Sequence, residues 1–279
     1  MCLLLLVPLS FSQASLASEY RLDRLEHRRW TGADGGPSQI GALAQTRDGY
    51  LWLGTHDSLY RLDGQHFTPY IPPTGNPIGI VSALKAVDEG LWVGLRKGGI
   101  RFMSQTGMTA YLAGDGLPRG VVYSIAQDRS GTVWAAVNDG LARFDGKVWH
   151  RIGADWKFPG QHAYAVFVDR AGTLWAANEE HLFYLPAGAE TFVDAGIAVD
   201  QASQITQAPD GAVWVAERYG GTLRRMVQQD SVTVTVVDGA NGLLFDRTGA
   251  LWVGTGGAGI RYVPASANDL SSVDRKSVV

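Results

Sequence analysis

Asp48-Gly49-Tyr50-Leu51-Trp52-Leu53-Gly54-Thr55 is the first of six copies of one short phrase in this sequence. Each copy is centred on a tryptophan, and successive tryptophans are 40, 42, 41, 39 and 38 residues apart. A period of about 40 residues is the length of one four-stranded propeller blade. The period therefore predicts an all-β protein, a β-propeller of four-stranded antiparallel blades with six repeats present. The six tryptophans are Trp52, Trp92, Trp134, Trp175, Trp214 and Trp252.

Turn signals flank the tryptophan in each repeat. In Asp128-Arg129-Ser130-Gly131 the aspartate can bond its own backbone, and the glycine supplies a positive φ. The later segment Leu141-Ala142-Arg143-Phe144 alternates apolar and basic residues, which is typical of a strand with one buried face. It ends in Asp145-Gly146, a strong hairpin signal. We therefore expect each repeat to supply an innermost strand, the tryptophan strand, the alternating strand and an outermost strand, the last at 191–193 in repeat four.

The repeated tryptophan is expected to be structural. A residue that recurs in every unit serves the unit, and a buried indole covers a large apolar area. Its side chain faces one neighbouring blade, while Leu51 and Leu53 on the same strand face the other.

The composition and the start of the chain favour an exported protein. The net charge is −3, so there is no electrostatic footprint for nucleic acid. Residues 1–17 read as a signal peptide, with an apolar run at 3–11 and small residues before a cut ahead of Ser18; the alternative is a disordered apolar tail. The single cysteine, Cys2, lies in that segment, so the mature chain has no disulfide. We expect a periplasmic protein whose mature segment makes no membrane contact.

The predicted domain boundaries follow from where the repeats stop. The propeller domain spans residues 18–264, and a tail spans 265–279. Residues 274–279 can be encoded by GAT CGG AAG AGC GTC GTG, which looks like read-through into a sequencing adapter. We expect this end to be a sequencing artefact and the chain to be a fragment of a longer one; a native polar tail is the alternative.

The repeats resemble the two-component regulator propeller family. The resemblance rests on Asp115-Gly116-Leu117-Pro118, on 246–255 around Trp252, and on Gly140-Leu141-Ala142-Arg143-Phe144-Asp145-Gly146, and it covers about 30–263. Alanine replaces the family's glycine after the tryptophan strand in repeats three to five, and repeat four lacks the closing Asp-Gly. The resemblance implies a truncated seven-bladed ring from a sensor anchored in the inner membrane.

The resemblance also implies the biochemical role. Family members carry propellers outside the inner membrane, followed by a β-sandwich, a membrane helix, and a histidine kinase or diguanylate cyclase. The expected function is ligand sensing for such an output domain, which would lie outside this fragment as a downstream module of the full-length chain. Two other classes stay open, a propeller enzyme such as a lyase and a plain protein-interaction scaffold.

The sequence offers no constellation for catalysis, metal binding or a cofactor. The six histidines show no paired ligand spacing of the zinc kind, and there is no nucleophile elbow, P-loop or calcium loop. We therefore expect no catalytic residues, no metal, no cofactor and no enzymatic activity in this segment.

Ligand recognition is expected on the face where the variable loops lie. In an up-and-down blade the loops after strand two and after strand four open on the same side, and variable polar loops on a rigid scaffold are where binding occurs. A small molecule, a saccharide or a peptide would suit them. Trp149, Trp156, Phe158 and His162 add aromatic rings outside the repeated tryptophan position, expected to be exposed. The candidate ligand-binding residues are Arg96, Lys97, Trp156, Asn178, Glu217, Arg218 and Tyr219.

Overall fold

The structure, a computed structural model, describes residues 32, 35–72, 75, 78–159, 161–218, 222–227, 230–235, 240–255 and 260–265; within 222–227 and 230–235 it describes the backbone. The predicted signal peptide, residues 266–279 of the predicted tail and Tyr219 lie outside these ranges.

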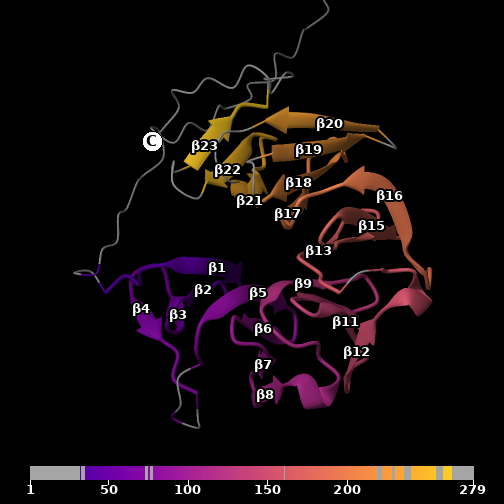
Figure 1. The fold of residues 1–279 in the computed structure, drawn as a ribbon. Coiled ribbons are helices and arrows are strands. Elements are labelled where there is room, and N and C mark those ends of the chain that lie inside the picture. Colours follow the sequence, from indigo (N-terminus) through magenta and orange to yellow (C-terminus); the bar gives the residue numbers. More distant parts are fainter. Residues whose placement is uncertain are drawn as a thin grey trace, which may run out of the picture.

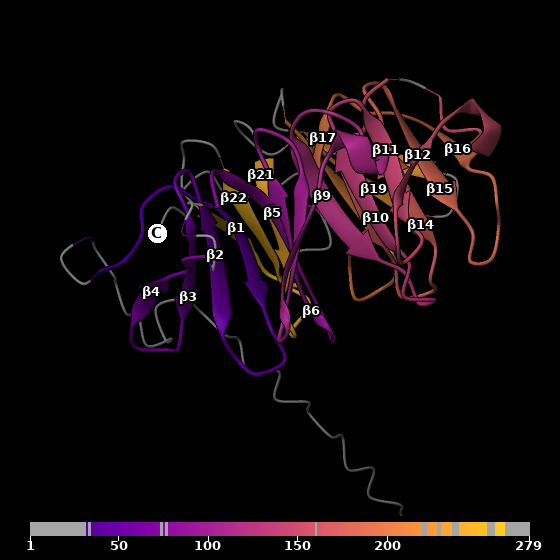
Figure 2. The same cartoon turned by 90° about the horizontal axis from the view of Figure 1, so that it is seen from below.

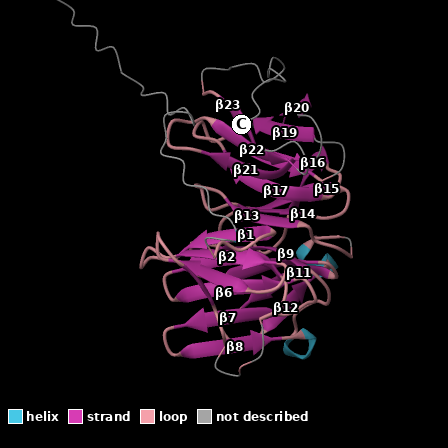
Figure 3. Ribbon diagram, turned by 90° about the vertical axis from the view of Figure 1, so that its left-hand side faces the viewer, coloured by secondary structure: helices cyan, strands magenta, loops and turns pink. Residues whose placement is uncertain are grey.

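The described chain forms six antiparallel sheets, as the tryptophan period predicted. Five sheets have four strands and the sixth has three, and strands consecutive in the chain are neighbours in every sheet. Among the described residues, the three-residue 3-10 turns are Ala113–Asp115 and Ala154–Trp156, the cyan segments of Figure 3. The all-β propeller architecture is therefore confirmed.

Each sheet is one blade, and the blades are numbered in chain order. Blades one to three consist of β1 (Ile40–Gln45), β2 (Leu51–Thr55), β3 (Leu59–Leu62), β4 (Phe67–Pro69), β5 (Val81–Val87), β6 (Gly90–Leu95), β7 (Ile100–Ser104), β8 (Gly107–Tyr111), β9 (Val122–Gln127), β10 (Val133–Val137), β11 (Gly140–Phe144) and β12 (Trp149–Ile152). Blades four to six consist of β13 (Ala165–Val168), β14 (Leu174–Ala177), β15 (His181–Leu185), β16 (Val193–Ala198), β17 (Ala202–Gln207), β18 (Val213–Glu217), β19 (Thr222–Val227), β20 (Asp230–Thr235), β21 (Ala240–Phe245), β22 (Leu251–Thr255) and β23 (Ile260–Val263).

The blades follow one another around a centre. Figure 1 looks along the axis, with the innermost strands β1, β5, β9, β13, β17 and β21 around the middle. Each innermost strand contacts that of the next blade. Figure 2 shows the same sheets from below, stacked face against face. Blade one and blade six are the two ends of this arc.

The repeated tryptophan packs each blade on the next one, as predicted. Trp134 of blade three shares a buried cluster with Val166, Leu174 and Phe183 of blade four. Its strand neighbours Val133 and Ala135 point the other way, into the cluster that holds Trp92 of blade two. Strand alternation therefore divides every blade into a forward face with the tryptophan and a backward face.

The glycine or alanine two residues after each tryptophan matches the residue that it meets on the next blade. A Cβ on Gly54 would lie 2.4 Å from Cγ1 of Val81, and one on Gly94 would lie 2.6 Å from Cγ1 of Val122. Alanine stands at this position in blades three to five, where the next blade carries alanine in place of valine. The buried pairs are Ala136 with Ala163, Ala177 with Ala202, and Ala216 with Ala240. The departures from the family pattern are thus matched size for size.

Serine side chains join the innermost strands of successive blades. Oγ of Ser82 donates to the carbonyl oxygen of Val122 at 2.7 Å, and Oγ of Ser203 donates to that of Ala240 at 2.7 Å. Oγ of Ser124 accepts from the backbone N–H of Val166 at 2.8 Å. Side chains thus bond strands that belong to different sheets.

The faces at the two ends of the arc are exposed. Leu43 on the backward face of blade one is 58% exposed, whereas Ile125 at the same position in blade three is 8% exposed. Leu244 on the forward face of blade six is 62% exposed, against 6% for Ala126 in blade three. Both end faces therefore carry apolar side chains that a further blade would bury.

One strand differs from the sequence prediction. The outermost strand of blade four was expected at 191–193, and the structure has it at Val193–Ala198. The backbone N–H of Phe192 instead bonds the carbonyl oxygen of Trp156 at 2.8 Å, so Phe192 belongs to the loop. Ile197 is buried and anchors the strand in the core. The prediction was wrong because the missing Asp-Gly hairpin removed the usual marker for the start of this strand.

Candidate functional site

The loops after strand two and after strand four lie together on one side of the ring. The backbone N–H of Arg96 bonds the carbonyl oxygen of Ile80 at 2.9 Å, and that of Asn138 bonds Val121 at 2.8 Å. In blade four the N–H of Val199 bonds the carbonyl oxygen of Glu180 at 2.7 Å. We call this side, formed by the loops after strands two and four, the loop face.

A group of aromatic and polar side chains lies at the centre of the loop face. The rings of Tyr123 and Tyr164 are 5.2 Å apart, and His162 lies 6.1 Å from Tyr164. The hydroxyl of Tyr123 donates to Oδ1 of Asn138 at 3.4 Å. The guanidinium carbon of Arg218 lies 5.4 Å from the centroid of the Tyr123 ring. We call these five residues the tyrosine cluster.

The tyrosine cluster joins residues of three blades next to the innermost strands. Tyr123 belongs to the innermost strand of blade three, and Tyr164 directly precedes that of blade four. Arg218 directly follows the tryptophan strand of blade five, and its guanidinium reaches the Tyr123 ring of blade three. A guanidinium over an aromatic face is an attractive pair, and both groups also suit an anionic or flat ligand. Nε of Arg218 has no hydrogen-bond partner within the described part of the chain.

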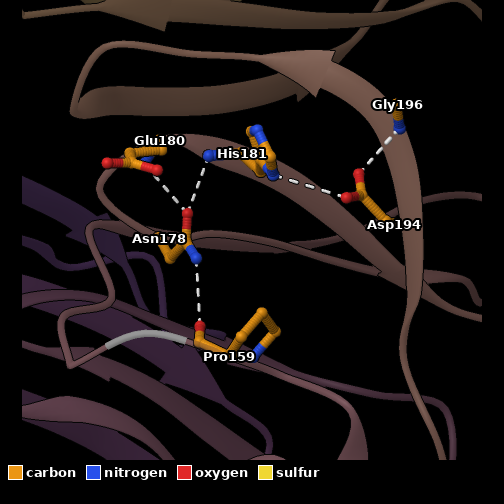
Figure 4. Close-up of polar contacts among 6 residues, drawn as sticks. All are labelled: Pro159, Asn178, Glu180, His181, Asp194 and Gly196. Carbon is orange, nitrogen blue, oxygen red and sulfur yellow. Dashed lines mark hydrogen bonds and ion pairs between the residues drawn. The ribbon is translucent and has the colours of Figure 1, made fainter.

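Asn178 holds two loops of the loop face together (Figure 4). Its Nδ2 donates to the carbonyl oxygen of Pro159 at 3.0 Å, and its Oδ1 accepts from the backbone N–H groups of Glu180 and His181 at 2.9 and 2.7 Å. The side chain is only 5% exposed. Asn178 therefore positions the loops on either side of it, with its amide groups already bonded.

The ring of His181 points away from Asn178, toward the outermost strand of blade four (Figure 4). Its Nδ1 lies 3.3 Å from Oδ2 of Asp194, and Oδ1 of Asp194 accepts from the backbone N–H of Gly196 at 2.8 Å. These contacts fix the edge of blade four next to the loop face.

Glu217 also has a bonded, buried side chain. It is 3% exposed, and its Oε1 accepts from the backbone N–H of Asp200 at 3.3 Å. Glu179 plays a comparable part in blade four, where its two oxygens accept from the N–H groups of Gln161 and His162 at 3.4 and 3.3 Å. Both carboxylates hold the loop that leads into the innermost strand of their own blade.

The remaining predicted residues lie apart from the tyrosine cluster. Arg96 and Lys97 are exposed in the loop of blade two. Trp156 is half-buried between blades three and four, where its ring packs edge-on against Trp134 at 5.9 Å. Of the predicted set, the structure thus brings Arg218 into the cluster and puts Asn178 and Glu217 in the loops that support it.

Two aromatic residues expected to be exposed are buried. Trp149 is 2% exposed; its ring packs edge-on against Trp92 at 5.7 Å and at a tilt against Phe144 at 5.2 Å. Phe158 is 2% exposed and contacts Phe183 at 5.2 Å. The prediction of exposed rings here was wrong because aromatic residues in the outermost strand and in the following loop can also fill the space between blades.

The sequence analysis missed Tyr123 and Tyr164, although the repeats held a signal. Both stand eleven residues before the tryptophan of their repeat. Glycine, serine or asparagine stands at the matching position of the other repeats: Gly41, Ser82, Ser203 and Asn241. Aligning the repeats on the turn before the tryptophan would have shown an aromatic residue in blades three and four alone.

The described residues include no group of three or more histidine, cysteine, aspartate or glutamate side chains that could hold a metal ion. Within the same part of the chain, no helix is long and apolar enough to cross a membrane.

The comparison with protein families finds two matching segments. Residues 34–57 and 116–139 match the family model described as two component regulator propeller. These segments hold the innermost strand and the tryptophan strand of blades one and three. The search of curated proteins finds none that matches the sequence.

Solved structures with the same fold come from two kinds of protein. The extracellular domains of two B. thetaiotaomicron proteins described as hybrid two component systems have TM-scores of 0.63 and 0.60 at 15% and 19% identity, over 81% and 86% of this chain. This chain covers only 38% and 42% of those two chains. A catalytically inactive virginiamycin B lyase from Staphylococcus aureus, solved with quinupristin, has a TM-score of 0.65 at 14% identity, over 82% of this chain and 85% of the lyase. At such identities the likeness shows the fold alone.

Proposed function

Because this chain carries two-component regulator propeller repeats, we propose that it is the ligand-sensing propeller part of a bacterial receptor's periplasmic domain. The similar extracellular domains of hybrid two component systems support this role. The output module, a histidine kinase or a diguanylate cyclase, would belong to the same full-length receptor. A small molecule, saccharide or peptide bound by the propeller would change the geometry of that module.

The ligand would bind at the tyrosine cluster on the loop face. The observation that carries this proposal is the reach of Arg218 from blade five to Tyr123 of blade three. A ligand that contacts both residues bridges blades three and five. Binding would then alter how these blades lie relative to one another, which is a change that a downstream module can sense.

The test compares the two faces of the propeller in the full-length receptor. We expect Arg218→Ala, alone or with Arg96→Ala, to weaken ligand binding roughly tenfold or more, because a charge-assisted contact is lost. Asp63→Asn and Asp145→Asn change hairpins away from the loop face and serve as controls. The assay measures activation of the output module over a panel of oligosaccharides and peptides. Weaker responses only in the two aspartate variants would place the site on the other face.

A lyase is the second candidate, because His162 has the geometry of a base. Its Nδ1 bonds the carbonyl oxygen of Asn138, and a carbonyl can only accept. In the neutral imidazole Nδ1 therefore carries the proton and Nε2 is left as the acceptor, and the ring lies 6.1 Å from that of Tyr164. Incubation of the protein with quinupristin separates the two functions by mass spectrometry. We expect no turnover; a product that disappears in His162→Ala would favour the enzyme.

A further inference from the structure

A cavity lies between blades three and four, away from the tyrosine cluster. Its volume is about 510 Å³, which is within the range of small-molecule sites. One wall is the turn 128–132 of blade three, and the other is formed by Gly172 and the loop 185–190 of blade four. The cavity therefore opens where strand one of each blade turns into strand two, whereas the tyrosine cluster lies beside the loops that follow strand two.

The inner surface of this cavity is apolar and partly aromatic. It is lined by Trp134, Trp156, Leu174 and Leu185, with Pro186 at the rim. Packed sheets are about 10 Å apart, and here the loop 187–189 of blade four carries only alanine and glycine. Small side chains between two sheets leave a slot. A slot with an indole wall suits a flat ring, which can stack on the indole.

The guanidinium of Arg143 is the polar group that the cavity leaves free. It lies 5.6 Å from the centroid of the Trp156 ring, and Arg143 is half-buried. No carboxylate of the described residues lies within ion-pair distance of Arg143. A partly buried guanidinium without an acid partner favours an anion, above all a carboxylate that can accept two N–H bonds.

The other charged groups at the cavity do not compete for that anion. Oδ1 of Asp128 accepts from the N–H groups of Ser130 and Thr132 at 2.9 and 3.0 Å, and Oδ2 accepts from Nε1 of Trp134 at 2.9 Å. Arg129 donates to the carbonyl oxygen of Arg170. Glu190 is exposed at the rim. Because Asp128 and Arg129 are already hydrogen-bonded, Arg143 is the charged group that a ligand inside the slot would contact.

The combination is not found in blade one, and in blade five the structure does not describe the side chain of the matching Arg225, which lies opposite Trp214. Arg61 of blade one holds the same register position as Arg143, opposite the tryptophan of its blade, but its guanidinium lies 4.3 Å from the centroid of Tyr50 instead. Blade four also lacks the Asp-Gly hairpin, and the loop from Pro186 to Glu190 replaces it. The non-repeating loop and the free arginine therefore meet at the junction between blades three and four.

We propose that the slot between blades three and four binds a small aromatic carboxylate. The ring lies between Trp156 and the loop 186–190, and the carboxylate accepts hydrogen bonds from Arg143. Ligand binding here adds contacts between blades three and four, so it also stabilises their packing.

The test is a titration of the full chain with benzoate, followed by calorimetry or by protein NMR. Benzyl alcohol supplies the ring without the charge, and acetate supplies the charge without the ring. We expect benzoate to bind at least tenfold more tightly than either of them. Arg143→Met should remove this preference for benzoate, because the favourable charged hydrogen bonds are lost. Arg143→Lys should show a preference for benzoate between that of the unchanged chain and that of Arg143→Met, because lysine keeps the charge without the planar guanidinium.

The matched control is Arg61→Met, which removes an arginine from the same register position in blade one and should bind benzoate like the unchanged chain. A second test variant leaves Arg143 and its strand unchanged. Ala187→Phe places a ring in the exposed loop at the edge of the slot, and it should block benzoate while circular dichroism stays unchanged. Equal binding of benzoate and benzyl alcohol would overturn the proposal. So would equal binding of benzoate by the unchanged chain and by a folded Arg143→Met or Ala187→Phe variant.

Discussion

At the scale of the single residue, the aspartate that begins the turn before the tryptophan makes two kinds of hydrogen bond. In blades three, four and six its Oδ2 accepts from the indole Nε1 at 2.9 Å, while its Oδ1 accepts backbone N–H groups of the turn. The aspartate therefore fixes both the turn and the orientation of the blade's main packing residue. Blade five has Ala208 at this position, and Nε1 of Trp214 has no partner among the described residues.

This difference predicts a stabilising substitution. Ala208→Asp should give Nε1 of Trp214 an acceptor and raise the free energy of unfolding by about 1 kcal/mol, the net value of a typical hydrogen bond. Urea denaturation measures the change. The reverse change in blade four, Asp169→Ala, leaves Trp175 without its acceptor and should destabilise by at least as much. A destabilising Ala208→Asp would mean that burying the new carboxylate costs more than its hydrogen bonds contribute.

Three turn aspartates predict how stability depends on pH. Burial raises the pKa of Asp246, but hydrogen bonds from Thr248, the Trp252 indole and backbone N–H groups outweigh it, and the net pKa is lowered. The pKa of Asp145 is lowered by the backbone N–H of Val148, by His150 and by the N–H of Lys147. The pKa of Asp63 is lowered by the N–H groups of His66 and Gln65.

The sign of the effect follows from these lowered pKa values. A carboxyl group whose folded pKa lies below its unfolded value of about 3.9 adds stability above that value, and the stability is lost as the pH falls through the folded pKa. We therefore expect the thermal midpoint to be flat from pH 7 to about 5 and to fall below about pH 4. Asp246→Asn should make the fall shallower. An equal acid loss in that variant would assign the loss to other groups.

At the scale of the element, the contact between one blade and the next depends on matched side-chain size. Gly94→Ala should destabilise by roughly 1–3 kcal/mol, because its methyl group would overlap Val122. Val122→Ala should also destabilise, by leaving a cavity. The double variant recreates the alanine pair of the later blades, so the two losses should not add, with a coupling of about 1–2 kcal/mol. Urea denaturation of the four proteins measures the cycle.

The control cycle pairs Val122→Ala with Gly54→Ala. Val81 meets Gly54 at a different blade interface. Here the two losses should add, since the sites share no contact. Additive losses in the first cycle as well would show that the junction does not depend on matched size.

The strands were predictable from the sequence wherever a turn signal marks both ends. The strand Val81–Val87, for example, coincides with an apolar run in the sequence that ends at a sharp turn. Blade four shows the limit of this reasoning, since its outermost strand begins later than expected without an Asp-Gly hairpin. Local patterns set a strand's alternation, but its partner strand decides where it begins.

For the whole molecule, the sequence could predict the arrangement of the blades and loops, but only part of the candidate binding site. Topology alone put the loops after strands two and four on one side, and the backbone bonds between them agree with that. The partners of Arg218 could not be predicted, because Tyr123 is 95 residues earlier in the chain (218 − 123). Nor could the burial of Trp149, which depends on a neighbouring blade. Long-range contacts of this kind follow from the way the blades pack around the centre of the arc.

The matched pairs between blades also have a consequence for the ancestry of the repeats. Blade three packs Val122 against Gly94 of blade two and Ala136 against Ala163 of blade four. It therefore joins one interface of the glycine–valine kind to one of the alanine–alanine kind. If blade three were copied to follow blade four, Val122 would meet Ala177 instead of a glycine. The blades therefore cannot exchange places without a change in side-chain size at their interfaces. Their order is written into the sizes of a few buried side chains, and a gene rearrangement that shuffled them would also have to rewrite both sides of each new junction.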